Sequence, residues 1–152
     1  MKKILVLCTG NACRSQMAEG YLRFFTQGAA DVLSAGLNPT YVHPMAIDVM
    51  QEDNIDISAA RSKGVEEFSG EHFDYLVLVC QRAHDRQPAD VNAKKVVFYD
   101  IPDPEEQARN GQDLREAFNE ARERVKREIL RFIGNQDDLD FRRSIVSDDC
   151  CA

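Results

Sequence analysis

Near its N-terminus the chain carries the stretch Ile4-Leu5-Val6-Leu7-Cys8-Thr9-Gly10-Asn11-Ala12-Cys13-Arg14-Ser15. A short apolar run leads into a cysteine, and an arginine follows that cysteine after five intervening residues. The apolar run predicts a buried strand, and the polar segment after it predicts a loop at the start of a helix. Such a loop can turn several backbone N–H groups towards one centre, and this arrangement attracts an oxyanion.

The loop has the residue types that an oxyanion site needs. Gly10 supplies backbone freedom, and Asn11 tolerates a left-handed backbone and can hydrogen-bond the loop to itself. Arg14 presents a planar fork that matches two oxygens of phosphate or arsenate. The same donors favour a negatively charged sulfur at Cys8. We therefore predict that Cys8 is a nucleophile below an oxyanion-binding loop formed by Thr9, Gly10, Asn11, Ala12, Cys13 and Arg14.

The flanking residues of this loop leave alternatives open. Ser15 can donate a hydrogen bond to the sulfur of Cys8 or cap the helix that follows. Cys13 lies next to Arg14, and we expect a structural role for it because free cysteine is commonly buried. A buried hydrophobe at the end of a strand is the alternative for Cys8 itself, but the strand, loop and helix together favour the nucleophile.

Composition restricts the class of protein. The 152 residues are enough for one domain with a proper core, and the net charge of −7 argues against a nucleic-acid partner or an anionic membrane. The sequence has neither an apolar run of about 20 residues nor a signal-peptide pattern, so we expect a cytoplasmic protein. Five cysteines at irregular spacing fit a reducing compartment and catalytic use, and no Cys or His spacing indicates a metal site.

Apolar periodicity predicts an alternation of strands and helices. The predicted strands are Lys3–Leu7, Val32–Ala35, Tyr75–Val79 and Val96–Tyr99. The predicted helices are Ser15–Thr26, Pro44–Asp53, a short one near Val65–Phe68, and Asp113–Ile133, which Gly134 is expected to end and whose core side includes Leu130. We expect residues 1–134 to form a single catalytic domain and residues 135–152 to form a mobile tail.

This alternation predicts an α/β fold with a parallel sheet and right-handed crossovers. In such sheets, ligands bind beyond the carboxyl ends of the strands. Three chemically active side chains follow predicted strands, namely Cys8, Cys80 and Asp103. Their convergence at one edge supports a single site.

The stretch from Cys8 to Ser15, continued by Gln16-Met17-Ala18-Glu19, closely resembles the low-molecular-weight protein tyrosine phosphatase superfamily, and within it the arsenate reductases. The similarity covers nearly all of residues 1–133. Gln16 stands where the phosphatases of this fold commonly have proline. The resemblance implies a four-stranded parallel sheet with helices on both faces.

The resemblance also implies roles for the candidate residues. Cys8 is the nucleophile, Arg14 clamps the oxyanion, Ser15 orients the thiolate and Asp103 is the general acid. Asp103 precedes a proline and could instead be a turn residue. Asp100 is the nearby rival for the acid role.

Cys80 separates a reductase from a phosphatase, because reducing arsenate to arsenite requires two electrons from thiols. In the implied mechanism, arsenate forms an adduct with Cys8, Cys80 attacks the sulfur of Cys8, and a Cys8–Cys80 disulfide remains as arsenite leaves. His84, Arg82 and Arg86 either favour the Cys80 thiolate or are solvated loop charges. An inert buried thiol is the alternative for Cys80.

The chain departs from the thioredoxin-coupled reductases, which usually carry a third cysteine where Gln87 stands. It carries Cys150 and Cys151 near its C-terminal end instead. These tail thiols either resolve the Cys8–Cys80 disulfide, bind arsenite, or take no part while an external thiol resolves it. Thioredoxin, glutaredoxin or glutathione is the expected electron donor.

Some reductases of this family hold potassium below the loop, and Asn11, Glu19 and Ser34 match that pattern. The threonine and aspartate expected further on are replaced by Arg61 and Lys63. A cationic side chain there could stand in for the ion, so the resemblance does not establish potassium dependence for this chain. We expect no tightly bound cofactor.

Two other functions compete with arsenate reduction. One is a phosphatase acting on phosphotyrosine or small phosphomonoesters through a phosphocysteine intermediate. Glu105 and Glu106 stand where phosphatases often have aromatic residues, and their charge would repel an anionic phosphopeptide. The other is a non-catalytic oxyanion-binding module, and the presence of Cys8, Arg14 and Asp103 argues against it.

Overall fold

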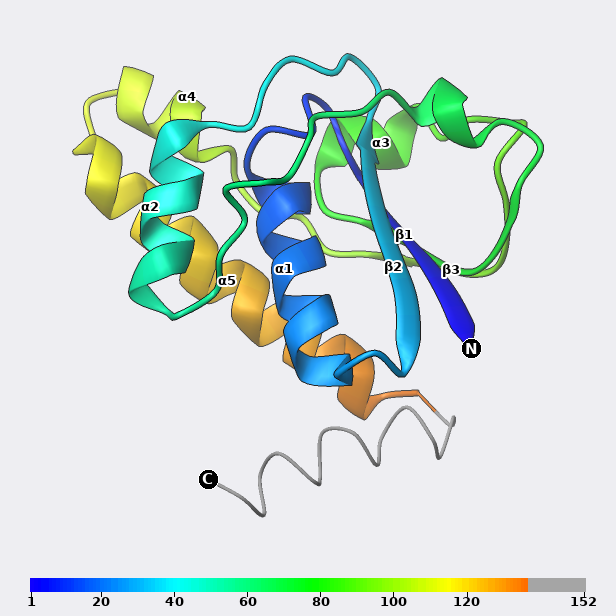
Figure 1. The fold of residues 1–152 in the computed structure, drawn as a ribbon. Coiled ribbons are helices and arrows are strands. Elements are labelled where there is room, and N and C mark those ends of the chain that lie inside the picture. The colour runs from blue at the N-terminus through cyan, green and yellow to red at the C-terminus, as the bar shows by residue number, and fades with distance from the viewer. Residues whose placement is uncertain (137–152) are drawn as a thin grey trace.

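The computed structural model describes residues 1–136, which form a four-stranded parallel sheet flanked by helices (Figure 1). The strands are β1 (Lys2–Cys8), β2 (Ala30–Gly36), β3 (His72–Leu78) and β4 (Asn92–Phe98). Their order is β2-β1-β3-β4, so β1 is an inner strand with a parallel neighbour on each side. The predicted α/β class and the parallel sheet are confirmed.

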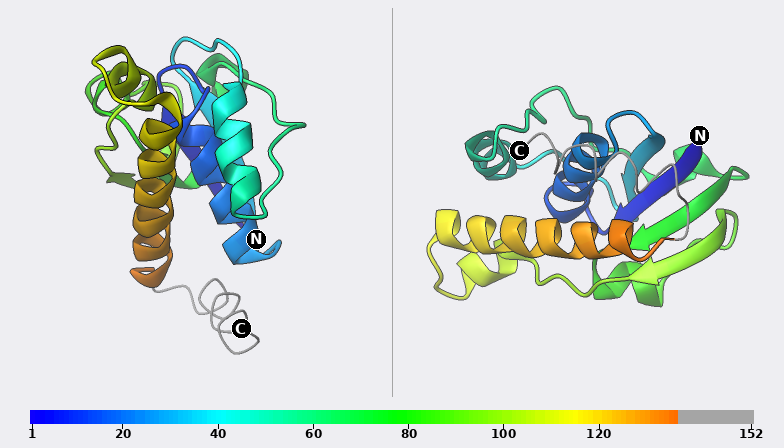
Figure 2. Two further views of the ribbon diagram at one scale, coloured as in Figure 1. Left: turned by 90° about the vertical axis from the view of Figure 1, so that its left-hand side faces the viewer. Right: turned by 90° about the horizontal axis from the view of Figure 1, so that it is seen from below.

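The helices vary from one turn to six. They are α1 (Arg14–Thr26), α2 (Pro44–Glu52), the 3-10 helix η1 (Val65–Phe68), α3 (Gln81–Asp85), α4 (Pro104–Arg109) and α5 (Leu114–Gly134). The helices α1 and α5 lie side by side, and α2 packs against α5 (Figure 1, Figure 2). The predicted tail cysteines Cys150 and Cys151 lie outside the described residues.

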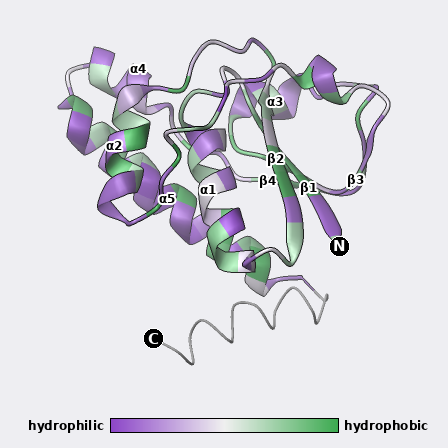
Figure 3. Ribbon diagram, in the orientation of Figure 1, coloured by the Kyte–Doolittle hydropathy of each residue, from purple (hydrophilic) through white to green (hydrophobic). Residues whose placement is uncertain are grey.

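The inner strand β1 is buried on both faces of the sheet. Successive residues of a strand point to opposite faces, yet Ile4, Leu5, Val6 and Leu7 are all fully buried. A run that is apolar at every position, not at alternate ones, is typical of a parallel strand covered on both faces. The long helix α5 instead alternates between hydrophilic and hydrophobic residues along its length (Figure 3), because one side of it faces solvent.

The structure corrects several details of the expected elements. The helices α3 and α4 were not predicted, because each is too short to show helical periodicity and is capped by a single side chain, Cys80 or Asp103. Gly134 is the last residue of α5, not the residue that ends it, and its C-cap is Asn135. Leu130 is exposed instead of facing the core.

The register of the strands brings the predicted site residues to one edge. Cys8, the last residue of β1, pairs with Gly36 of β2, and Leu7 lies opposite Leu78 of β3. Cys80 therefore follows β3 at the same edge at which β1 ends. The sheet topology explains why residues distant in sequence meet there.

A polar contact lies between the helices α1, α2 and α5. The buried Tyr21 of α1 donates a hydrogen bond of 2.7 Å to Asp53, the C-cap residue of α2, and Lys126 of α5 lies 3.0 Å from the same oxygen. Burial alone would raise the pKa of Asp53, but the hydrogen bonds from Tyr21 and Lys126 outweigh it and lower that pKa. The carboxylate thus joins three helices.

We predict that Asp53→Asn destabilises the fold at neutral pH. Because folding lowers the pKa of Asp53, its contribution is present above the unfolded pKa of about 3.9 and is lost as the pH falls through the folded value. Losing the charged partner should lower the free energy of unfolding by about 1–3 kcal/mol at pH 7, and the difference should narrow below about pH 4. Urea denaturation at pH 7 and at pH 3 measures the difference in free energy of unfolding between the variant and the wild type. The exposed Asp90→Asn is the control. An equal cost at pH 7 and pH 3 would contradict this account.

Candidate active site

The loop after β1 turns its carbonyl groups outward. The carbonyl oxygens of Cys8, Thr9, Gly10 and Ala12 accept hydrogen bonds from backbone N–H groups within residues 37–43, at 2.8–3.1 Å. In a planar trans peptide, the N–H of the next residue points the opposite way from the carbonyl. The N–H groups that follow these carbonyls therefore point to the inner side of the loop. An anion-binding nest on that side of the loop would use these N–H groups.

Asn11 connects the loop to the elements around it. It is fully buried and has the left-handed backbone (φ 49°) that the sequence predicted for it. Its Nδ2 donates to Ser15 Oγ at 2.8 Å and to Ser34 Oγ at 2.9 Å. Its Oδ1 accepts from Gln16 Nε2 at 3.0 Å and from the backbone N–H of Lys63 at 2.8 Å. The side-chain amide is thus fully satisfied.

The orientation of the Asn11 amide decides the role of Ser15. A backbone N–H can only donate, so the contact with Lys63 fixes which end of the amide is the oxygen. Its nitrogen then donates to Ser15 Oγ, which leaves the hydroxyl proton of Ser15 to point at Cys8 Sγ, 2.8 Å away. This hydrogen bond stabilises a thiolate at Cys8. Of the two roles considered for Ser15, the structure supports the one towards the sulfur, because the cap position of α1 is Cys13.

Two neighbouring segments support the loop from outside, through contacts that sequence reasoning missed. A Cβ at Gly36 would lie 2.6 Å from the carbonyl oxygen of Thr9, so only glycine permits this approach of β2 to the loop. The segment 61–64 donates from Ser62 Oγ to the Gly10 carbonyl at 2.9 Å, and its Lys63 carbonyl accepts from Gly36 N at 2.8 Å. These contacts are between residues far apart in sequence, and no local pattern encodes them.

The loop lines a cavity of about 220 Å³. Liquid water occupies roughly 30 Å³ per molecule, so this volume suffices for a four-oxygen anion. The residues around it are Cys8, Thr9, Gly10, Ala12, Cys13, Arg14, Thr40, Asp103, Glu105 and Arg109. Sequence reasoning did not single out Arg109, whose distance from the loop along the chain gives no signal.

A second hollow of about 540 Å³ adjoins this cavity, and Cys80 lines it together with Arg14 and Asp103. Arg14 and Asp103 line both hollows, whereas Asp100 lines only this one, which does not include Cys8. The geometry therefore favours Asp103 over Asp100 as the acid nearest the nucleophile. Arg14 is held in place by a hydrogen bond of 3.0 Å to the carbonyl of Ile101, two residues before Asp103.

Cys80 is buried at the end of β3 and caps the one-turn helix α3. Its Sγ accepts a hydrogen bond from the backbone N–H of Ala83 at 3.4 Å and lies 3.4 Å from Thr9 Oγ1. Thr9 is the residue directly after Cys8, so Cys80 touches the oxyanion loop itself. Of the basic residues near Cys80, Arg82 lines its hollow, whereas His84 stacks on Phe98.

Cys13 is buried and faces an acid. Its Sγ donates to Glu105 Oε1 at 3.4 Å, and burial together with the Glu105 carboxylate raises the pKa of the Cys13 thiol well above its ordinary range. A thiol held protonated is a poor nucleophile. The structural role expected for Cys13 agrees with this contact. Glu105, expected to repel a phosphopeptide, does line the cavity.

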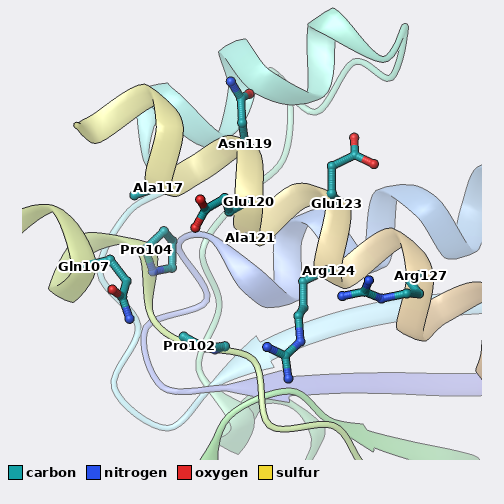
Figure 4. Close-up of a pocket in the computed structure, with 10 residues that line it drawn as sticks. All are labelled: Pro102, Pro104, Gln107, Ala117, Asn119, Glu120, Ala121, Glu123, Arg124 and Arg127. Atoms are coloured by element: carbon teal, nitrogen blue, oxygen red, sulfur yellow. The ribbon is translucent and has the colours of Figure 1, made fainter. Parts of the chain in front are cut away.

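A further groove of about 480 Å³ lies between α5 and the residues around the start of α4 (Figure 4). Pro102 and Pro104 form one wall, and α5 residues including Ala117, Ala121 and Arg124 form the other. None of the predicted site residues lines it. Among residues 1–136, no group of three or more His, Cys, Asp or Glu side chains could hold a metal ion, and no helix is long and apolar enough to cross a membrane.

Comparison with known proteins agrees with this geometry. Residues 3–140 match the model of the low molecular weight phosphotyrosine protein phosphatase family. A protein of Synechocystis sp. named glutaredoxin arsenate reductase is 35% identical over 133 residues, which cover 88% of this chain and 97% of that protein. A solved arsenate reductase in its oxidized state has a TM-score of 0.76 at 33% identity, covering 88% of this chain and 98% of that one. Another, in a phosphate-binding state, has a TM-score of 0.75 at 35% identity, with the same coverage.

The structure is that of an α/β protein in which the loop after β1 lines a cavity together with Cys8, Arg14 and Asp103. The chain belongs to the low-molecular-weight phosphotyrosine protein phosphatase family. Within that family it is similar to proteins named arsenate reductase.

We predict that Ser15→Ala slows the reaction of Cys8 with iodoacetamide. The variant removes a hydrogen bond to a charged sulfur, a contact of about 1.5–3 kcal/mol, so the alkylation rate at pH 7 should fall roughly ten- to a hundredfold. Quenched alkylation with peptide mass spectrometry measures that rate at Cys8 alone. The exposed Ser69→Ala, on the loop after η1, should react like the wild type. An unchanged rate in Ser15→Ala would mean that the hydroxyl does not stabilise the thiolate.

Proposed function

We propose that this protein reduces arsenate to arsenite, with Cys8 as the nucleophile and Cys80 as the second redox thiol. The position of Cys80 is the observation that carries the proposal, because a phosphatase needs only one thiol. Cys80 lines a hollow together with Arg14 and Asp103 and contacts Thr9 of the oxyanion loop. The names of the similar proteins in the family support the same activity.

In the first step, the Cys8 thiolate attacks arsenic while Arg14 and the loop N–H groups hold the arsenate oxygens. One oxygen leaves as water, and Asp103 supplies the proton that makes it a good leaving group. The product is an adduct in which the sulfur of Cys8 is bonded to arsenic(V). Asp103 lines the Cys8 cavity, and its backbone position is fixed because its carboxylate caps α4 through Glu105 N at 2.9 Å.

In the second step, the Cys80 thiolate attacks the sulfur of Cys8. The electron pair of the sulfur–arsenic bond passes to arsenic, which leaves as arsenite, and a Cys8–Cys80 disulfide forms. Cys80 lies one residue beyond the position opposite Cys8 along the direction of β3. A spacing of about 4.8 Å between strands and a rise of about 3.3 Å per residue give a Cα–Cα distance of about 6 Å for such a pair. That separation is within the range of disulfides.

Forming this disulfide requires little of the fold to move. Cys80 must give up the hydrogen bond that its Sγ accepts from Ala83 N. This hydrogen bond caps α3, a helix of only five residues. A single turn has almost no stability of its own. We therefore expect α3 to unwind when the disulfide forms, while β1 and β3 stay in place.

The disulfide must then accept two electrons from other thiols. The described residues contain one more cysteine, Cys13, whose thiol is buried against Glu105. We propose that residues 1–134 are the catalytic domain and that the reducing thiol comes either from the tail cysteines Cys150 and Cys151 or from an external donor such as glutaredoxin, glutathione or thioredoxin.

The proposed function predicts that Cys80→Ser separates two reactions. Arsenate reduction should fall to background, because no thiol can displace arsenite from Cys8. Hydrolysis of an aryl phosphate needs only Cys8, Arg14 and Asp103, so any such activity of the wild type should survive. Arsenite formation and release of nitrophenol from its phosphate ester measure the two.

Two outcomes would overturn the proposal. One is a Cys80→Ser variant that still reduces arsenate. The other is a wild type that reduces none with any of the three donors but hydrolyses the phosphate ester, which would make the protein a phosphatase. The Cys8→Ser variant should lose both reactions and is the control for contaminating activity.

A second prediction concerns the tail. If Cys150 or Cys151 resolves the disulfide, the Cys150→Ser/Cys151→Ser double variant and a chain ending at Gln136 should both lose turnover with thioredoxin. Each should still perform one round of reduction, because Cys8 and Cys80 remain. Truncation after Gln136 keeps the hydrogen bond of that side chain to the Phe132 carbonyl. Full turnover in both variants would assign the reduction step to the external thiol alone.

A further inference from the structure

Two oxygens beneath the loop already have donors from the protein. Asn11 Oδ1 accepts from Lys63 N and Gln16 Nε2, and the Arg61 carbonyl accepts from Gln16 Nε2 and Lys63 Nζ at 3.1 Å each. Glu19 faces two cations, with Arg23 Nε at 3.1 Å and Lys63 Nζ at 4.0 Å. A potassium ion, such as the one that some reductases of this family hold, would meet an ammonium group there. The residues of this chain do not fit that ion.

The charged side chain of Lys63 is largely buried in this region. Its side chain is 13% exposed, and its partner Glu19 is 14% exposed. Arg61, the other cation of the segment, is 66% exposed and pairs with Glu67 on the surface. Burial lowers the pKa of Lys63, and the Glu19 carboxylate opposes that effect. Of the two cations that the sequence places here, only Lys63 reaches beneath the loop.

The ammonium of Lys63 stabilises the segment that orients the nucleophile. It donates to the Arg61 carbonyl two residues earlier, while the backbone N–H of the same residue donates to Asn11 Oδ1. Asn11 in turn positions Ser15, and Ser15 contacts Cys8. Three successive hydrogen bonds therefore connect the segment 61–63 to the sulfur, and a fixed conformation of that segment keeps the Ser15 hydroxyl directed at Cys8.

We propose that Lys63 is a positioning residue whose ammonium group serves as a built-in cation beneath the oxyanion loop and makes the activity independent of monovalent metal ions. The inference rests on Cys8 being the nucleophile of the proposed function. Without Lys63, the Arg61 carbonyl would lose a donor and Glu19 would lose the cation that lies 4.0 Å from its Oε1. Among the described residues, neither this oxygen nor the buried Gln16 Oε1, one turn earlier on the same helix, has a hydrogen-bond partner. Oxygens of this kind are the ligands that hard cations prefer.

The test replaces Lys63 with methionine, which keeps the length of the side chain but removes its charge. In choline chloride, Lys63→Met should react with iodoacetamide at Cys8 at least tenfold more slowly than the wild type. Potassium chloride at the same ionic strength should restore much of that rate and raise the melting temperature of the variant. The wild type should respond to neither salt. Alkylation needs no arsenate, so this test is independent of whether the protein reduces arsenate.

The control is Lys94→Met, whose side chain is 81% exposed beside Asp74 and should change nothing. If Lys63→Met does not fold, the Glu19→Gln/Lys63→Met double variant also removes the carboxylate that Lys63 faced, and it should fold with slow alkylation that potassium cannot restore. Three results would overturn the proposal: wild-type reactivity in Lys63→Met or in that double variant, slow alkylation in Lys63→Met that potassium does not relieve, or a wild type that potassium itself activates.

Discussion

The hydrogen bond from the backbone of Lys63 to the side chain of Asn11 is the contact on which the site depends. It fixes the direction of the Asn11 amide, and through it the direction of the Ser15 hydroxyl towards Cys8. Reversing that amide would place its nitrogen against two donors, Lys63 N and Gln16 Nε2. The Ser15 hydroxyl would then face the amide oxygen and could donate to it instead of to the sulfur. The reactivity of one cysteine is thus decided by a peptide group more than fifty residues away along the chain.

Much of the fold could be predicted from sequence, because it is encoded locally. The run from Ile4 to Leu7 is buried on both faces and therefore apolar at every position, which is a strong signal. That Cys8, Arg14 and Asp103 lie at one edge of the sheet could also be predicted, since Cys8 and Asp103 follow predicted strands and Arg14 precedes a predicted helix. The one-turn helices α3 and α4 could not, because a capping side chain holds each one and no periodicity announces it.

The contacts that support the loop could not be predicted for a different reason. Gly36 directly follows the predicted strand Val32–Ala35, yet the close approach of the Thr9 carbonyl is what requires a glycine there. Ser62 and Lys63 belong to a segment with no regular structure, and their partners are far away in sequence. Lys63 drew attention only as a departure from a family pattern, and its role depends on coordinates.

One scaffold can serve both phosphoryl transfer and arsenate reduction because both begin with attack by the same thiolate on a tetrahedral anion. The fate of the resulting adduct depends on a second sulfur. The parallel pairing of β1 with β3 places Cys80 next to the oxyanion loop. The short helix α3 that follows Cys80 has little stability of its own and unwinds at a small cost in free energy. The chemistry therefore changes at the end of one strand while the loop stays the same.

The most direct test of this account is a single turnover without any thiol donor. The fully reduced protein, ending at Gln136 to exclude the tail cysteines, is mixed with excess arsenate, and its peptides are mapped without reduction. We expect one arsenite released per protein molecule and a disulfide that joins Cys8 to Cys80. Arsenite release with a disulfide from Cys8 to Cys13, or no arsenite at all, would contradict the central claim.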